Sequence, residues 1–125
     1  MNNTDLEERL IKFAVIIIDI ARNIPKDYIV GHLASQISRS GTSCALNYGE
    51  AQGGESKKDF IHKMQIVTKE LRETKVCLRI LQEAKFFKNN EKLNIAIKEN
   101  TELISIFIKS VNTAKSNFAR KQSNR

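Results

Sequence analysis

The chain has 125 residues, a net charge of +7 and 41% apolar residues. These values fit one folded domain over residues 1–125, because a disordered chain lacks the apolar area that offsets chain entropy. Residues 2–9 hold no basic stretch ahead of an apolar run, and no apolar run approaches the roughly 20 residues of a membrane span. We therefore expect a cytoplasmic protein with no membrane partner.

The first predicted helix covers about residues 5–23, where apolar residues recur at steps of four and three from Leu6 to Ile24. Thr4 or Asp5 is expected to cap it. A second apolar line lies on a neighbouring side of this helix and consists of Ile11, Ala14 and Ile18, with Val15 beside it. A helix that is apolar on two sides needs a second partner, so this line predicts a subunit interface.

The second predicted helix covers about residues 28–51 and ends before Gly53-Gly54, whose permissive dihedral angles suit a helix C-cap and a turn. Its middle is rich in small residues, from Ser38 to Ser43, which would let a neighbouring backbone approach closely. Gly41 costs about 1 kcal/mol of helix stability relative to alanine. That cost predicts a packing or hinge role.

Four polar residues mark the corner between the second and third predicted helices. Ser56 and Asp59 have the spacing of a capping box at the start of the third helix. Asn47 and Glu50 lie one helical turn apart near the end of the second helix. We expect them to satisfy backbone groups at the corner rather than to bind a ligand.

The third predicted helix covers about residues 57–86 and buries a stripe that runs from Phe60 to Leu81. Its opposite line mixes charges with Ile66, Cys77 and Ile80. That mixture fits either a polar subunit interface or a solvated face with isolated apolar residues.

The fourth predicted helix covers about residues 91–119, and the tail 119–125 is expected to fray. Phe86 and Phe87 precede this helix and should plug the end of the bundle. No segment has the two-residue period of a strand. The sequence therefore predicts an all-α fold, an up-and-down four-helix bundle.

The side chains favour no catalytic residue, no metal site and no cofactor, so we expect a protein that is not an enzyme. His32 and His62 have no predicted base or orienting partner, and no Glu-x-x-His pair of the kind found in di-iron bundles occurs. Residues 49–54 are rich in glycine but lack the spacing of a phosphate-binding loop. Cys44 and Cys77 are isolated, which predicts buried free thiols.

Positive charge gathers in the second half of the chain. Residues 1–55 hold five basic and seven acidic side chains, a net charge of −2, whereas residues 56–125 hold sixteen and seven, a net charge of +9. From residue 105 onward there are five basic residues and no acid. Such a split fits a surface for nucleic acid, or a solvated helix end with favourable charge.

Several segments resemble the bacterial four-helix bundle family known as ribosomal-RNA intervening-sequence proteins. The most specific are Arg39-Ser40-Gly41-Thr42-Ser43, Asn47 with Glu50, Ser56 with Asp59-Phe60, and Lys69-Glu70 with Glu73-Thr74. The family usually shows Asn-Ile-Ala-Glu-Gly where this chain has residues 47–51, and commonly carries aromatics at Val76 and Cys77.

The resemblance implies a short up-and-down bundle that assembles as a homopentamer and has no enzymatic activity. It also implies a relation to the accessory variability determinant of diversity-generating retroelements, a basic pentamer that works with a reverse transcriptase and nucleic acid.

Two functions follow as hypotheses. In the first, an oligomer presents a basic surface to RNA or DNA and contacts phosphates as point charges, because few aromatics are available to stack on bases. The candidate residues are Lys57, Lys58, Lys63, Lys109, Lys115, Arg120 and Lys121. In the second, the oligomer holds a protein partner on an apolar patch around Ile95 and Ile106, and its charge serves only solubility.

Overall fold

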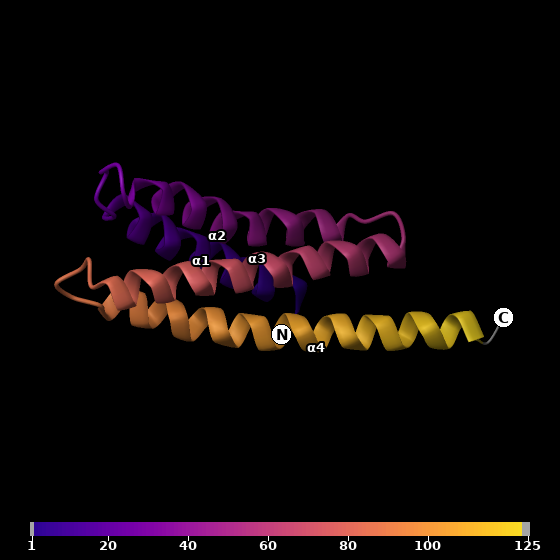
Figure 1. The fold of residues 1–125 in the computed structure, drawn as a ribbon. Helices are drawn as coiled ribbons and strands as arrows, with labels where there is room; N and C mark the ends of the chain where they lie inside the picture. The colour runs from indigo at the N-terminus through magenta and orange to yellow at the C-terminus, as the bar shows by residue number, and fades with distance from the viewer. Residues whose placement is uncertain (1, 124–125) are drawn as a thin grey trace.

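The computed structural model describes residues 2–123, which form four helices in an up-and-down bundle (Figure 1). The helices are α1 (Asn3–Arg22), α2 (Gly31–Gln52), α3 (Lys57–Ala84) and α4 (Glu91–Ser123). Within residues 2–123 there is no strand. Helix α2 packs against α1 and α3, α3 also packs against α4, and α1 touches α4 more slightly. The predicted all-α four-helix bundle is confirmed.

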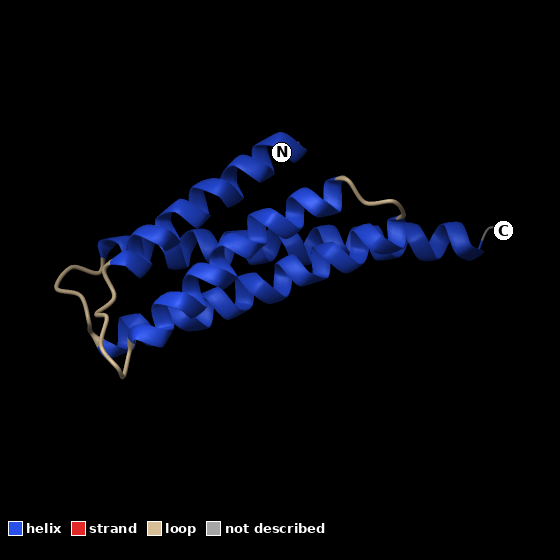
Figure 2. Ribbon diagram, turned by 90° about the horizontal axis from the view of Figure 1, so that it is seen from above, coloured by secondary structure: helices blue, strands red, loops and turns tan. Residues whose placement is uncertain are grey.

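The connections place two loops at one end of the bundle and one at the other (Figure 2). The α1–α2 and α3–α4 connections share one end, and the α2–α3 connection lies at the other. Helix α4 is the longest of the four and projects past the α2–α3 connection (Figure 1). The last turns of α4 therefore extend beyond the body of the bundle.

The start of α1 lies earlier than predicted, because the capping residue is Asn2 rather than Thr4 or Asp5. The Asn2 side chain accepts a hydrogen bond from the Asp5 backbone N–H at 2.8 Å, and the Asp5 carboxylate accepts from the Asn2 N–H at 3.4 Å. This reciprocal pair satisfies two of the backbone donors that a helix N-terminus leaves free.

The start of α2 lies later than predicted, at Gly31 rather than about residue 28. The Asp27 carboxylate accepts hydrogen bonds from the backbone N–H groups of Ile29 and Val30, at 2.9 and 2.8 Å. These bonds hold residues 27–30 in a turn. Tyr28 and Ile29 consequently project from the end of the bundle.

The α2–α3 corner confirms the predicted glycine C-cap, but without a left-handed conformation. Gly53 caps α2 at φ −95°, and no glycine among residues 2–123 has a positive φ. Gly54 serves close approach instead, because a Cβ there would lie 3.1 Å from both the Ala51 carbonyl oxygen and Asp59 Oδ2. The left-handed conformation occurs at Lys85, the C-cap of α3, at φ 57°.

The ends of α3 and α4 also differ from the prediction. Helix α3 ends at Ala84 instead of about residue 86, and α4 continues to Ser123 instead of ending near residue 119. Alanine, arginine, lysine and glutamine at 119–122 are all good helix formers, and cations in the last turn suit the helix dipole. Residues 124 and 125 of the predicted frayed tail lie outside the described part.

The core follows the predicted stripes. Leu10, Phe13 and Ile17 of α1 are fully buried, and the rings of Tyr48 and Phe107 pack edge to face with centroids 5.6 Å apart. Gly41 is buried against α1, so the small-residue segment of α2 does serve close helix packing, as predicted. Phe86 and Phe87 pack half-buried against the core.

A layer of three polar side chains crosses the middle of the core, formed by Ser40, Thr74 and Asn100, all fully buried. Thr74 Oγ1 lies 2.8 Å from Ser40 Oγ and joins α2 to α3. In the amide orientation that satisfies both neighbours, Asn100 of α4 donates to the Leu71 carbonyl oxygen at 3.0 Å and accepts from the Lys75 N–H at 3.2 Å. Each of these three buried side chains thus has a hydrogen-bond partner, as buried polar groups require.

Candidate nucleic-acid interface

The seven candidate cations separate into a cluster, a paired residue and dispersed residues. Lys57, Arg120 and Lys121 come together where the first turn of α3 lies beside the C-terminal part of α4 (Figure 1). Lys63 is paired. Lys58, Lys109 and Lys115 are exposed and lie outside this cluster.

The clustered cations line a shallow depression of about 270 Å³, together with Asn117. Arg120 Nη2 donates to Asn117 Oδ1 at 2.9 Å, which orients the guanidinium and leaves the Asn117 NH₂ group available. The nearby Lys121 ammonium lowers the pKa of Lys57. Among residues 2–123 none of the three cations forms an ion pair. The depression is therefore positively charged and lacks a protein counterion.

An apolar depression of about 310 Å³ adjoins the charged one and shares Lys57 and Asn117 with it. Its other walls are Phe60, Ile61 and Ala114. Phe60 was predicted only as a core residue, and few aromatics were expected to be available to stack on bases. The helical spacing of three between Lys57 and Phe60 could have indicated that they share a side of α3.

Lys63 differs from the other candidates because its Nζ lies 2.7 Å from Glu50 Oε2, across the α2–α3 corner. This hydrogen bond raises the pKa of Lys63. Glu50 thus acts at the corner by binding a side chain, not by satisfying backbone groups as expected. Lys63 is consequently not a free phosphate contact.

The other corner residues act locally. Asn47 Nδ2 donates to the Ser43 carbonyl oxygen at 2.9 Å, within α2. Ser56 caps α3, since the Asp59 N–H donates to its hydroxyl at 3.0 Å. The predicted return bond from the Ser56 N–H to the Asp59 carboxylate is not present among the described residues. Ser56 is therefore confirmed as the helix cap, but only one of the two hydrogen bonds of a capping box is formed.

The remaining ion pairs tie neighbouring helices together. Arg9 of α1 donates to Glu99 of α4, with Nε 3.0 Å from Oε2, and Lys92 Nζ lies 2.8 Å from Asp19 Oδ2. Both pairs bridge the thinly packed α1–α4 seam. Arg39 of α2 pairs with Glu70 and Glu73 of α3. The negative charge of Glu70 is the main cause of the raised pKa of Arg39.

The predicted interface residues divide by exposure. Val15, Ile80 and Ile11 keep 58%, 45% and 41% of their surface exposed. Ile18 and Ile66 are half-buried. Cys77 is buried in the core at 5% exposure, which corrects its placement on the interface, because α3 turns it toward its own bundle. Exposed apolar side chains that were not among the predicted interface residues are Tyr28, Ile29, Leu46 and Val76.

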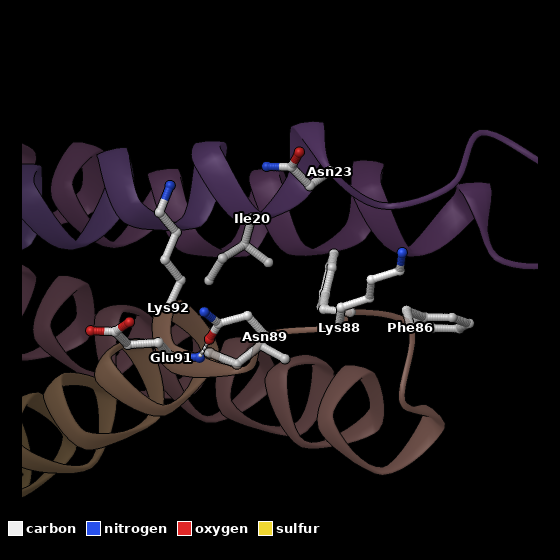
Figure 3. A pocket seen from close by; sticks show the side chains of 9 residues that line it. Ile20, Asn23, Phe86, Lys88, Asn89, Glu91 and Lys92 are labelled. Atoms are coloured by element: carbon white, nitrogen blue, oxygen red, sulfur yellow. Dashed lines mark hydrogen bonds between the residues drawn. The ribbon is translucent and has the colours of Figure 1, made fainter.

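The opposite end of the bundle holds a cavity of about 450 Å³ (Figure 3). Its apolar walls include Ile20, Phe86 and Leu93, and its rim carries Lys88 and the Lys92 that is paired with Asp19. Within residues 2–123 no three His, Cys, Asp or Glu side chains gather closely enough to hold a metal ion. None of the described helices is both long and apolar enough to span a membrane. No feature of this arrangement points to catalysis.

Comparison with known proteins identifies a family and a similar solved structure. Residues 3–110 match the family model described as 23S rRNA-intervening sequence protein. The fold is similar to a crystal structure of a protein of unknown function from the S23 ribosomal protein family of Bacteroides thetaiotaomicron VPI-5482. That chain shares 27% identity at a TM-score of 0.76, over 90% of this chain and 99% of the other. A search of curated proteins finds no match.

Proposed function

The chain belongs to the 23S rRNA-intervening sequence protein family, and from this premise we propose that it is a non-enzymatic homo-oligomer that binds RNA or DNA through a basic surface. One observation supports this most directly. Lys57, Arg120 and Lys121 converge from two helices with no acidic partner among the described residues. Structural cations of this chain, such as Arg9 and Arg39, are paired with carboxylates instead.

The oligomer is supported by the outer face of α1, where Ile11 and Val15 remain exposed. Burying this face and Ile18 against another subunit would remove about 200 Å² of apolar surface per chain, worth on the order of 5 kcal/mol before association costs. The resemblance to intervening-sequence proteins implies a pentamer. Five chains at +7 each would carry +35.

Binding through phosphates makes a specific prediction about salt. Each phosphate that a lysine or arginine neutralises releases condensed counterions, so affinity falls steeply with salt concentration. Fluorescence anisotropy should show binding of structured RNA and of duplex DNA at low salt, weakening on a straight log–log line at moderate salt. Absence of binding even at low salt would exclude this function.

A protein-interaction module is the second candidate, and Tyr28 and Ile29 support it. They are 102% and 78% exposed, and they belong to the α1–α2 connection, which lies at the end of the bundle away from the α2–α3 connection (Figure 2). The exposed apolar patch around Ile95 and Ile106 is smaller than expected, because Ile106 packs half-buried against the core. A pull-down after nuclease treatment separates the two candidates. A partner retained by the wild type and lost by Tyr28→Ser/Ile29→Ser favours the module.

A further inference from the structure

The charged depression and the apolar depression lie side by side and share two residues, Lys57 and Asn117. One is lined only by Lys57, Arg120, Lys121 and the Asn117 amide. The other adds the half-buried ring of Phe60, with Ile61 and Ala114. A ligand that filled both would carry an anionic group next to a flat, apolar group.

We propose that the two depressions form one site for a nucleotide unit of single-stranded nucleic acid. The phosphate lies among Lys57, Arg120 and Lys121, and the base lies against Phe60, Ile61 and Ala114. This inference rests on the proposed nucleic-acid function. It deepens that function, because it predicts where binding is centred and that unpaired strands are preferred.

The phosphate half follows from the charges. Hydrogen-bonding contact with the Lys121 side chain lowers the pKa of Lys57, and the repulsion between the two ammonium groups lowers it further. An anion between them makes two attractive contacts, which offset the repulsion between the ammonium groups. The Arg120 guanidinium, oriented by its 2.9 Å hydrogen bond to Asn117, offers its other N–H groups to the same anion.

The base half follows from shape and chemistry. An aromatic side chain beside cations is the common arrangement of single-strand binding surfaces, where bases stack on rings while lysine and arginine follow the backbone. Asn117 lies in both depressions, and the NH₂ group that its contact with Arg120 leaves free can donate to a phosphate or a base oxygen. A base inside a duplex is already stacked and paired, so it cannot enter the apolar depression.

The test compares a single-stranded 12-nucleotide RNA with its duplex, using fluorescence anisotropy over a range of salt. Lys57→Met/Lys121→Met should weaken single-strand binding at least tenfold and reduce the log–log salt slope by up to about 0.7, since the cluster holds one phosphate and each neutralised phosphate contributes about 0.7 on a single strand. The matched control Lys26→Met/Lys98→Met removes the same charge from exposed sites outside the two depressions. It should change affinity less than threefold.

The aromatic contribution is tested by Phe60→Leu, which keeps an apolar side chain against the core. It should weaken single-strand binding about tenfold, as loss of one stacking contact does, and leave duplex binding unchanged. Circular dichroism confirms that each variant folds. Equal losses for both lysine pairs, or equal affinity for single strand and duplex, would overturn the site while leaving the proposed function intact.

A second measurement tests the nucleotide site with a mononucleotide instead of a nucleic-acid strand. Adenosine monophosphate should raise the melting temperature of the wild type more than inorganic phosphate does, and should not raise that of Lys57→Met/Lys121→Met. If the wild type binds no RNA but shows this shift, the proposed function fails and the nucleotide site stands. An equal shift with inorganic phosphate, or no shift with either ligand, would overturn the site.

Discussion

Gly41 of α2 lies so close to Ile17 of α1 that a Cβ on the glycine would sit 2.7 Å from Ile17 Cγ2. Real side chains essentially never approach that closely, so the two helices have no space for a methyl group at this point. The contact draws α1 onto α2 and explains why a helix tolerates glycine at its centre.

Gly41→Ala should therefore lower the free energy of unfolding by about 1–2 kcal/mol, because overpacking outweighs the roughly 1 kcal/mol that alanine gains in helix propensity. Gly49→Ala is the matched control, since nothing lies within 4 Å of a Cβ at that position of the same helix. It should raise the free energy of unfolding by up to about 1 kcal/mol. Urea denaturation at fixed protein concentration measures both, and a stabilising Gly41→Ala would contradict the close contact.

The apposition of Lys57 and Lys121 should make stability depend on pH at the alkaline end. The pKa of Lys57 in the folded protein lies below the ordinary value of 10.5. In the pH window between the folded-state pKa and 10.5, the unfolded chain therefore binds more protons than the folded one. Stability should then rise with pH across that window, as repulsion is relieved. Lys121→Met removes the repulsion at all pH values.

The measurement is the melting temperature of the wild type and Lys121→Met without added anions. The variant should be more stable at pH 7, and the difference should vanish above pH 10.5 as Lys57 loses its charge in both states. A wild type that is more stable than the variant at pH 7 would contradict the repulsion.

Val15→Glu should dissociate the oligomer while the monomer keeps its helix content, because Val15 is the most exposed apolar residue of α1 and the inner stripe through Leu10 and Ile17 remains. Ile18→Glu should also weaken the oligomer, but it disturbs a half-buried position as well. Size exclusion with light scattering measures the mass. A wild type that runs as a stable 14.2 kDa monomer at micromolar concentration would exclude the oligomer.

Ile95→Glu provides the control for this experiment. It makes a similar exchange at a 50% exposed residue of α4, and the mass should stay that of the wild type. Dissociation by Ile95→Glu would place the interface on α4 instead of α1.

Both thiols should be unreactive in the folded protein. Burial raises the pKa of Cys44 to about 12 and also raises the pKa of Cys77. Thiolates are the reactive form, so a disulfide reagent at pH 8 should label neither cysteine until urea is added, when it should label both. Ser35→Cys at an exposed position of α2 supplies the reactive control. Rapid native labelling of the wild type would show that the core opens locally.

The fold was largely predictable because helical periodicity records which side chains face the core. Leu10, Phe13 and Ile17 lie at helical spacing, and all three are fully buried. Helix ends were less predictable, since several residues can cap a helix. Asn2 caps α1 although Thr4 and Asp5 are also suitable, and Asp27 delays α2 by ordering a turn that competes with the first helical turn.

The candidate site was predictable only in part. Periodicity within α3 relates Lys57 to Phe60, and periodicity within α4 relates Asn117 to Lys121, but neither shows that the two pairs meet. Their meeting depends on how far α4 projects past the start of α3. In the same way, Lys63 looks like Lys57 in the sequence, yet the corner brings it to Glu50.

The buried polar layer fixes the axial register of the bundle. If α4 slid along α3 by one helical turn, about 5.4 Å, the Asn100 amide would leave Leu71 and Lys75 and lie unsatisfied against apolar side chains, which is costly. Apolar stripes alone would tolerate such a slip, because one leucine can replace another. The Asn100 amide therefore fixes the position of α4 along α3. It keeps Lys121, about six helical turns further along α4, beside Lys57.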